Sequence, residues 1–230
     1  GALVLAWFNG KLKLKDGVSL NYEEAKSVKV SVTATDSADH QITKTFTISV
    51  GNVNEAQTAM TLSASSVKEN ALGAVIGTLK VTDPDAGDKQ SFTVSDPRFE
   101  VVNSKLQLKP GVSLDFEQGS SINIDVTATD KGGNQITTTF TINVGDVNEA
   151  QTALTLDNVQ VAENAAGAVV GNLSVADQDA GDTQTFKVSD NRFEIVNGQL
   201  KLKDGASFDH ETTGSVDVTV TATDSAKHSI

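Results

Sequence analysis

An internal repeat of 94 residues constrains this chain more than any other feature. The segment NGKLKLKDGVSLNYE, which begins at Asn9, recurs with few changes from Asn103 and again from Asn197. The strand-like VTATD recurs in the same register, ending at Asp36, Asp130 and Asp224. A repeat of this length predicts a series of similar domains rather than one large core.

The register of the repeat predicts three domains. Residues 1–54 match the C-terminal part of a repeat, and residues 55–148 form a complete one. Residues 149–230 form a third repeat without its last strand, because Ile230 matches Ile136 and the segment that would match Thr137–Val144 is missing. We therefore expect an excerpt from a longer array. The strand Ile42–Val50 of a second chain could complete the last repeat, which would join chains head to tail.

Alternation of apolar and polar residues predicts about seven short strands in each repeat. In residues 136–144, for example, Ile136, Phe140 and Ile142 share one face and threonines occupy the other. Turn residues such as Asp85-Ala86-Gly87 separate these runs, and no window has a helical period. The pattern predicts an all-β chain of Ig-like Greek-key sandwiches arranged end to end.

Charge and composition exclude several classes of function. A net charge of −12 argues against nucleic acid as a partner, since phosphate binding needs clustered Lys and Arg. The longest apolar run, Leu3–Phe8, is too short to insert into a membrane, so an export signal would lie outside this chain. The chain has no cysteine, which excludes disulfides, zinc–thiolate sites and thiol chemistry.

The carboxylates recur at strand ends and in turns, where they can gather at the poles of a sandwich. The clearest example is the turn DPDAGD from Asp83, which recurs as DQDAGD from Asp177. Several carboxylates at one pole would repel one another, and Ca²⁺, which takes six to eight oxygen ligands, relieves that repulsion. The plain alternative is that these residues only form turns. We accept that alternative for Asp96 and Asp190, and leave Asp88 and Asp182 open.

In their order, these motifs resemble the cadherin repeat family across essentially the whole chain. The family's first-strand Glu matches Glu69 and Glu163, and its V-x-A-x-D strand matches VTATD in all three copies. Its LDRE motif resembles LDFE (Asp115, Glu117), FDHE (Asp209, Glu211) and LNYE (Asn21, Glu23). Its DxD motif matches Asp83/Asp85 and Asp177/Asp179, and its DxNDN linker resembles DVNEA from Asp146 and NVNEA from Asn52. The motif sequences DPDAGD and DVNEA most resemble those of the bacterial branch of the family, which is found in giant cell-surface adhesins.

The resemblance implies a set of Ca²⁺ ligands at each of two junctions between repeats. The implied ligands at the second junction are Glu69, Asp115, Glu117, Asp146, Asn148, Glu149, Asp177, Asp179 and Asp224. Those at the first junction are Asn21, Glu23, Asn52, Asn54, Glu55, Asp83, Asp85 and Asp130. Two asparagines replace aspartates at the first junction and the first-strand Glu is missing, so we expect weaker binding there.

The resemblance further implies an extracellular, calcium-binding structural or adhesion module on a bacterial cell surface, of the kind used in biofilms. Calcium at the junctions would stiffen the repeats into an extended rod, and homophilic contacts between chains are one expected means of adhesion. A polysaccharide-binding cadherin-like module, with cell-surface polysaccharide as its partner, is the alternative. A passive spacer without calcium is a third interpretation, which the repeated acidic junctions disfavour.

Enzymatic motifs fail on inspection, so we predict that the chain is not an enzyme. An EF-hand loop starting at Asp83 would need Glu at its twelfth position, where Val94 stands. The pair His210-Glu211 begins like a zinc-protease motif, but Gly214 occupies the place of the second histidine. The pair Asp115/Glu117 recurs once per repeat, which suits a ligand set better than a glycosidase dyad. His40 and His228 are expected in exposed turns.

Overall fold

The computed structural model describes residues 5–230, and every regular element in this range is a β-strand. Contacts divide the chain into two compact units. The first takes in the chain up to Ser66 together with Leu72–Val112 and Asn123–Ile142. The second takes in Val67–Ala71, Ser113–Ile122 and everything from Asn143 on. None of the described residues forms a helix long and apolar enough to cross a membrane.

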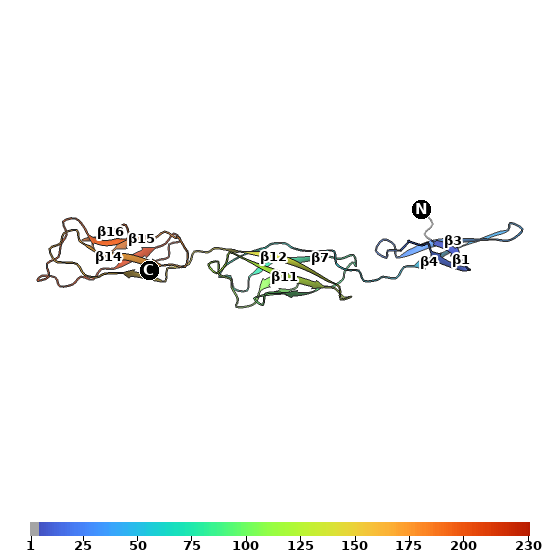
Figure 1. The fold of residues 1–230 in the computed structure, drawn as a ribbon, viewed down its shortest axis with the longest axis horizontal. Coiled ribbons are helices and arrows are strands. Elements are labelled where there is room, and N and C mark those ends of the chain that lie inside the picture. The colour runs from blue at the N-terminus through green and yellow to red at the C-terminus, as the bar shows by residue number, and fades with distance from the viewer. Residues whose placement is uncertain (1–4) are drawn as a thin grey trace. The chain divides into compact units, whose positions relative to one another are not determined.

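The first unit begins with two antiparallel ribbons. They pair β1 (Leu5–Phe8) with β2 (Lys11–Leu14), and β3 (Ser27–Thr35) with β4 (Gln41–Ser49). A four-stranded sheet follows in the order β5-β7-β10-β9, made of Ala59–Leu62, Val75–Thr82, Lys105–Leu108 and Phe99–Val102. A second sheet has the order β6-β12-β11-β8, made of Ser66–Lys68, Gln135–Gly145, Ser121–Thr129 and Ser91–Val94. Strands β6, β11 and β12 each contain residues of both units, and Figure 1 labels β11 and β12.

The second unit repeats this plan in its last 78 or so residues. Its four-stranded sheet has the order β13-β14-β17-β16, made of Ala153–Leu156, Val169–Ala176, Gln199–Leu202 and Phe193–Val196. A two-stranded sheet pairs β15 (Thr185–Val188) with β18 (Val220–Thr223). Strand for strand, β13 to β17 match β5, β7, β8, β9 and β10 at the repeat distance. The prediction of an all-β fold is confirmed.

Alternation along the strands decides which side chains are buried. On β10, Leu106 and Leu108 are fully buried, and on β11 every second residue from Ile124 to Ala128 is buried. In the second unit, Val170, Phe193, Leu200 and Leu202 form the buried centre of the last repeat. Burying large apolar side chains is the main force that holds such sheets together, at roughly 1.5–3 kcal/mol for each one fully buried.

The recurrent Asn-Gly pairs form two-residue hairpin turns. Asn9-Gly10 joins β1 to β2, and Asn197-Gly198 joins β16 to β17, with φ positive at both residues of each turn. Such turns match the twist of the paired strands and favour Asn followed by Gly. In the middle repeat the same turn is Asn103-Ser104, so a serine adopts a φ of 60° there.

Candidate metal centre

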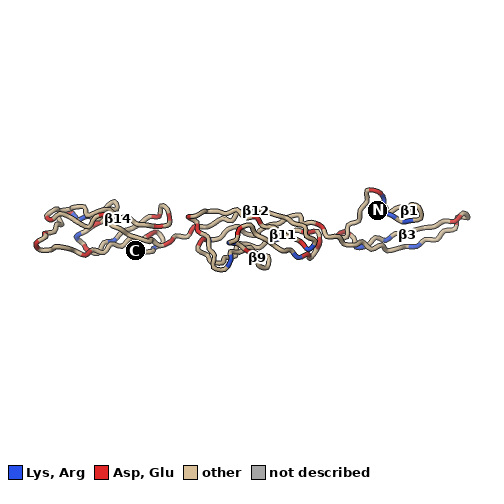
Figure 2. Tube along the Cα trace, turned by 60° about the horizontal axis from the view of Figure 1, so that its bottom comes forward, with Lys and Arg blue, Asp and Glu red and all other residues tan. Residues whose placement is uncertain are grey.

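One group of acidic side chains lies entirely within the second unit. Glu69 follows β6, Glu117 lies between β10 and β11, Asp146 and Glu149 follow β12, and Asp179 follows β14. One carboxylate oxygen each from Glu69, Glu117 and Asp146 lie within 4.8 Å of one another, and so do those of Glu117, Glu149 and Asp179. Glu117 thus belongs to both triads. Figure 2 shows acidic residues gathered beside the end of β12.

Backbone hydrogen bonds fix the carboxylates of this second site. Glu69 is only 2% exposed, and its two oxygens accept hydrogen bonds of 2.7 Å from the amides of Phe116 and Val147. The amide of Glu149 donates to Asp179 Oδ2 at 2.7 Å. These bonds tie the segment after β12 to the turn after β14, so the carboxylates are placed by the fold itself.

The proximity of these carboxylates raises their pKa values. Burial, followed by the negative charges of Asp179 and Glu69, raises the pKa of Asp146. Burial and neighbouring carboxylates likewise raise the pKa of Glu117 and of Glu149. Each raised pKa means that the ionised form is disfavoured where it stands, which is the signature of repulsion that a cation would relieve.

The second site fits a hard cation by its chemistry. Its donors are all oxygens, the ligands that Ca²⁺ prefers. Asn148 Oδ1 and Glu149 Oε2 are buried, and neither has a hydrogen-bond partner among the described residues. Buried acceptors are nearly always satisfied in folded proteins, so these two atoms indicate a missing partner that carries positive charge or donates protons.

Three residues of the predicted second set lie outside the two triads named above and accept hydrogen bonds from nearby residues. Both oxygens of Asp115 accept hydrogen bonds from Gln118 in the same turn. Asp177 accepts from the amide of Asp179 and from Gln184. Asp224, 5% exposed, accepts from the amide of His228 and faces its ring Nδ1 at 2.7 Å.

His228 is therefore not the freely exposed turn residue that the sequence predicts. Its side chain is 42% exposed and lies against the buried Asp224. His40, at the matching place of the first repeat, is exposed as predicted, although its ring lies 3.0 Å from Asp36.

Asp182 is a member of the site that sequence reasoning left undecided. Its Oδ2 accepts hydrogen bonds from Asn148 Nδ2 at 2.9 Å and from the amide of Ser225 at 3.3 Å. Hydrogen bonds from Ser225 and Asn148 lower its pKa to about 2. The signal was present in the sequence, since Asp182 ends the repeated DxDxGD turn.

A matching group of side chains lies within the first unit. Carboxylate oxygens of Glu23, Glu55 and Asp85 lie within 4.8 Å of one another. A second triad has the same spacing and consists of Asp83, Asp88 and Asp130. Asp88 is the counterpart of Asp182, so both residues that the sequence left open stand among the candidate ligands.

In this first site, amide side chains donate hydrogen bonds to the carboxylates and so stabilise their charge without a cation. Asn52 Nδ2 donates to Asp85 Oδ1 at 2.9 Å, and this bond, with one from the Glu55 amide, lowers the pKa of Asp85. Asn54 and Asn134 both donate to Asp130 Oδ2 at 2.8 Å. Burial opposes ionisation of Asp130, but these bonds lower its pKa overall.

The remaining members of the first site carry less charge. Asn21 accepts a hydrogen bond from the amide of Glu23 in its own turn, and desolvation raises the pKa of Glu55, with Glu23 adding to the shift. Compared with the second site, the first therefore satisfies more of its carboxylate oxygens with hydrogen bonds from amide side chains.

A glycine explains one difference between the two sites. A Cβ on Gly132 would lie 2.5 Å from Asn54 Nδ2, so only glycine leaves room for Asn54 to reach Asp130. The matching residue of the last repeat is Ala226, and there Asn148 donates to Asp182 instead.

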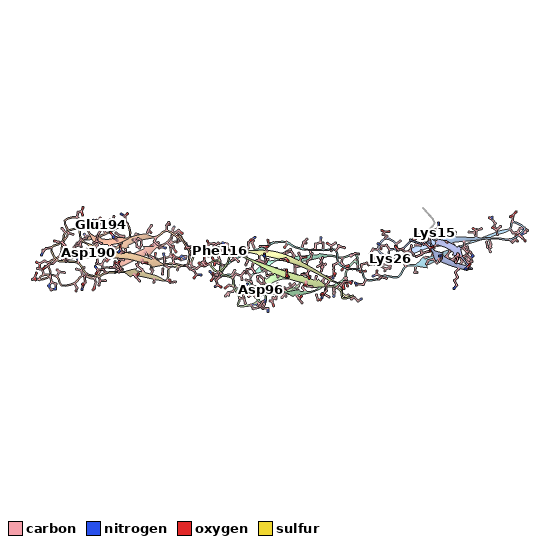
Figure 3. The ribbon with its side chains drawn as sticks, viewed as in Figure 1. Lys15, Lys26, Asp96, Phe116, Asp190 and Glu194 are labelled. Carbon is pink, nitrogen blue, oxygen red and sulfur yellow. The ribbon has the colours of Figure 1, made fainter. Side chains whose placement is uncertain are left out.

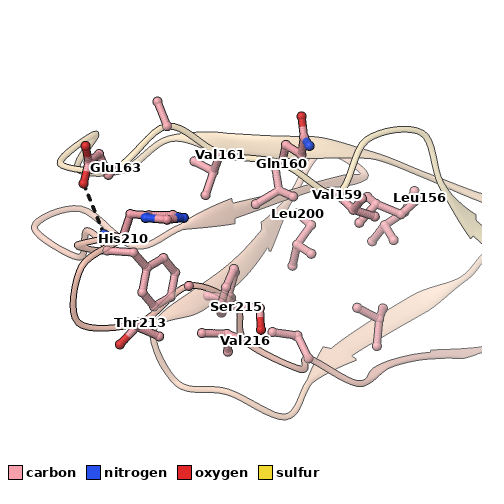
Figure 4. Close-up of a pocket in the computed structure, with 18 of the residues that line it drawn as sticks. Leu156, Val159, Gln160, Val161, Glu163, Leu200, His210, Thr213, Ser215 and Val216 are labelled. Carbon is pink, nitrogen blue, oxygen red and sulfur yellow. Dashed lines mark hydrogen bonds between the residues drawn. The ribbon is translucent and has the colours of Figure 1, made fainter.

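A third acidic group lies in the last repeat and consists of Glu163, Asp209 and Glu211. The amide of His210 donates to Glu163 Oε2, as the amide of Phe116 does to Glu69 Oε2 (Figure 4). This group repeats the first half of the second site in both sequence and contacts.

The last repeat also contains an open groove of about 950 Å³, lined by both polar and apolar side chains (Figure 4). Val161, Val218 and Val220 line it and are half-buried. Their counterparts in the middle repeat, Val67, Ile124 and Val126, are buried at 8% exposure or less.

Two aspartates that the sequence assigned to turns have a structural role. Asp190 accepts hydrogen bonds from the amide and guanidinium of Arg192, and Asp96 accepts them from Arg98 in the same way. Figure 3 labels both aspartates. The hydrogen bonds from Arg192 lower the pKa of Asp190 to about 2. Both pairs close the turn before the next strand.

Comparison with known proteins agrees with this geometry. A model of the cadherin domain matches residues 63–145. Protocadherin gamma-A10 of Pan troglodytes is 31% identical over 153 residues, which is 62% of this chain and 16% of that protein. Protocadherin gamma-A12 of Homo sapiens is 33% identical over 141 residues, or 56% of this chain and 15% of that protein.

Solved structures with the same fold include extracellular fragments of protocadherins. A structure of PcdhgB3 EC1-4 superposes with a TM-score of 0.74 at 22% identity, covering 95% of this chain and 58% of that one. Domains 1–4 of protocadherin gamma B7 superpose with a TM-score of 0.68 at 25% identity, again covering 95% and 58%.

The chain spans about a sixth of the length of the curated relatives and rather more than half of these solved chains. The relatives named here are animal proteins, so these comparisons do not support an assignment to bacterial adhesins or biofilms. They do support the cadherin assignment and the prediction that the chain is not an enzyme. A model of the cadherin domain thus matches the middle repeat over residues 63–145, and the chain shares the all-β fold of the tandem domains in these protocadherin structures.

Proposed function

We propose that the chain is an extracellular calcium-binding adhesion module in which Ca²⁺ binds at the two sites described above. The second site carries the proposal. Five carboxylates share two triads there, three of them have a raised pKa, and two buried oxygens in the same segment have no partner among the described residues. A doubly charged cation is the simplest group that satisfies all of these at once.

Calcium would act mechanically. The ligands of each site come from successive repeats and from the linking segment between them, so one set of ions would hold three stretches of chain in a fixed geometry. Without calcium, repulsion between the carboxylates would keep the linking segment mobile. With calcium, successive repeats would form a stiff, extended rod. Extracellular modules achieve this with dissociation constants of about 10⁻⁴–10⁻³ M.

The domain limits that follow from this proposal are residues 1–54, 55–148 and 149–230. The linking segments after β4 and β12 then belong to the junctions. The sequences of the DPDAGD and DVNEA motifs are the basis for proposing that the protein lies on a bacterial cell surface.

Isothermal titration calorimetry of the whole chain with CaCl₂ tests the proposal. Glu117→Gln removes one charge from both triads of the second site and should weaken binding there by at least tenfold. Glu100→Gln is the matched control, because Glu100 lies on β9, outside both sites, and accepts a hydrogen bond from Gln107. Absence of calcium binding by the unaltered chain at 5 mM CaCl₂, or equal binding by both variants, would overturn the assignment.

Homophilic contact between chains is a second proposal, favoured by exposed apolar side chains on β4. Strand β4 has the sequence QITKTFTIS and pairs with β3 alone, and its Ile42 and Phe46 are exposed. The free edge of β4 could pair with a strand edge of a second chain. Light scattering should then show association that rises with concentration and is lost in Ile42→Lys. A strict monomer at high concentration would exclude this contact.

Polysaccharide binding remains the alternative function. Among the exposed aromatics that could stack on a sugar, Trp7 and Phe8 lie on β1 and Phe46 lies on β4. Lys13 covers the Phe8 ring and Lys44 the Phe46 ring, which leaves Trp7. Glycan-array binding that disappears in Trp7→Ala would favour it over the calcium-dependent rod.

A further inference from the structure

Two buried glutamines occupy matching positions in the two repeats, outside the predicted ligand sets. Gln57 and Gln151 are each only 7% exposed. Each follows the linking segment and precedes the first strand of its sheet, β5 or β13. Burial of an amide side chain is costly unless its donors and acceptors are paired, so a buried glutamine recurring at one repeat position calls for a role beyond packing.

Both glutamines make the same two contacts. Gln57 Nε2 donates to Gln90 Oε1 at 2.8 Å and to the carbonyl of Asn134 at 3.2 Å. Gln151 Nε2 donates to Gln184 Oε1 at 2.8 Å and to the carbonyl of His228 at 3.4 Å. Each therefore joins two loops that surround its own site.

The second glutamine of each pair passes the contact on to a candidate ligand. Gln90 Nε2 donates to Asp83 Oδ2, and Gln184 Nε2 donates to Asp177 Oδ2, each at 3.0 Å. The other oxygen of Asp177 accepts from the amide of Asp179 at 3.1 Å. The carboxylate is thus held at both oxygens while lone pairs remain free for a cation, because a carboxylate can accept about four hydrogen bonds.

The other contact of each buried glutamine leads to the aspartate that ends VTATD, which is Asp130 or Asp224. Asn134 donates to Asp130, and His228 contacts Asp224. One buried glutamine therefore connects the linking segment, the DxDxGD turn and the loop after VTATD within each site. All the residues of each hydrogen-bonded series lie within one compact unit.

We propose that the glutamine pairs Gln57–Gln90 and Gln151–Gln184 are positioning residues that orient Asp83 and Asp177 toward the bound calcium. The inference rests on the proposed function and adds residues that bind no metal themselves. Partners that orient a ligand from behind typically contribute 10–100-fold to metal affinity. Loss of one amide should therefore weaken calcium binding without removing any ligand oxygen.

Gln184→Met tests this, since it keeps the length of the side chain and removes both of its hydrogen bonds. Calcium titration of the whole chain should show the second site weakened by about 10–100-fold and the first site unchanged. Gln199→Met is the matched control, because Gln199 donates to Asn172 at an exposed position between strands. It should leave both sites unchanged.

A purely structural role would look different. It would lower the melting temperature in chelator and leave the calcium dissociation constant of the folded protein as it was, which would overturn the inference. Gln151→Met provides an independent variant that leaves Gln184 in place, and it should weaken the second site by a smaller factor. If the unaltered chain binds no calcium, the proposed function fails. If it binds normally and both variants bind equally well, only the positioning role fails.

Discussion

The two candidate sites differ most at a single position of the linking segment. Asn52 donates its amide to Asp85 in the first site, whereas Asp146 adds a carboxylate to a triad in the second. The amide satisfies an aspartate that a cation could otherwise bind, and the carboxylate adds charge that only a cation relieves. Charge count at a calcium site sets its affinity, so this exchange should control the order of filling.

Exchanging these residues gives a direct prediction. Asn52→Asp should tighten calcium binding at the first site by about tenfold, and Asp146→Asn should weaken the second by a similar factor. Titration calorimetry of both variants and the unaltered chain measures the effect. Filling of the first site before the second in the unaltered chain would contradict this account of the difference.

The ion pair of Asp190 with Arg192 predicts a pH dependence remote from the metal sites. Hydrogen bonds from Arg192 lower the pKa of Asp190 from 3.8 to about 2. A pKa that is lower in the folded state stabilises the fold above pH 3.8, and this stabilisation is lost as the pH falls toward 2. Asp190→Asn should therefore unfold at a lower temperature than the unaltered chain at pH 6.

The gap in melting temperature between these two proteins should close between pH 4 and pH 2. Calorimetric unfolding in chelator at several pH values measures it without interference from calcium. A gap that stays constant down to pH 2 would show that the pair does not stabilise the fold through the charge of Asp190.

At the scale of strands and turns, the hairpin between β9 and β10 offers a stabilising substitution. Ser104 has a φ of 60°, in the left-handed region, where the other two repeats carry Gly10 and Gly198. For a residue with a Cβ, that conformation costs about 1 kcal/mol of folding free energy. Replacement by glycine removes this cost but also increases the conformational freedom of the unfolded chain, which offsets part of the gain.

Ser104→Gly should therefore stabilise the chain by about 0.5 kcal/mol. Chemical denaturation of the two proteins in the same buffer checks the difference in the free energy of unfolding. The reverse change, Gly198→Ser, should destabilise by a similar amount, and stabilisation by both changes would contradict the conformational reason.

The strands were largely predictable because their periodicity is strong. The alternation that predicts a strand in residues 136–144 corresponds to β12, in which less exposed and exposed residues alternate as expected. The repeat itself sharpened these predictions, since each strand could be seen two or three times. The division of the first strand into β5 and β6, in different sheets, carries no clear period in so short a segment.

The membership of the metal sites was predictable in outline and not in detail. Asp182 and Asp88 stayed open because an aspartate in a turn is the same in sequence whether it caps the turn or faces a cation. The partners of Asp115 and His228 depend on side-chain direction, which spacing does not specify. The glutamine pairs could not be recognised from sequence, because glutamine is common on exposed surfaces and only the burial of Gln57 and Gln151 and their hydrogen bonds distinguish them.

For the molecule as a whole, calcium at the proposed sites would join successive repeats. Stability and dimensions in solution should then change together on adding calcium, because the same ions would stabilise the fold and restrain the linking segments.

Thermal unfolding and small-angle X-ray scattering of the unaltered chain, in 5 mM CaCl₂ and then in excess chelator, test this claim most directly. We predict a melting temperature higher by several degrees in calcium, together with a longer and less flexible particle. An equal concentration of MgCl₂ should reproduce neither effect, since Mg²⁺ prefers to keep its own waters. Identical melting temperatures and scattering curves in calcium and in chelator would contradict the account, and the acidic residues would then serve only to form turns.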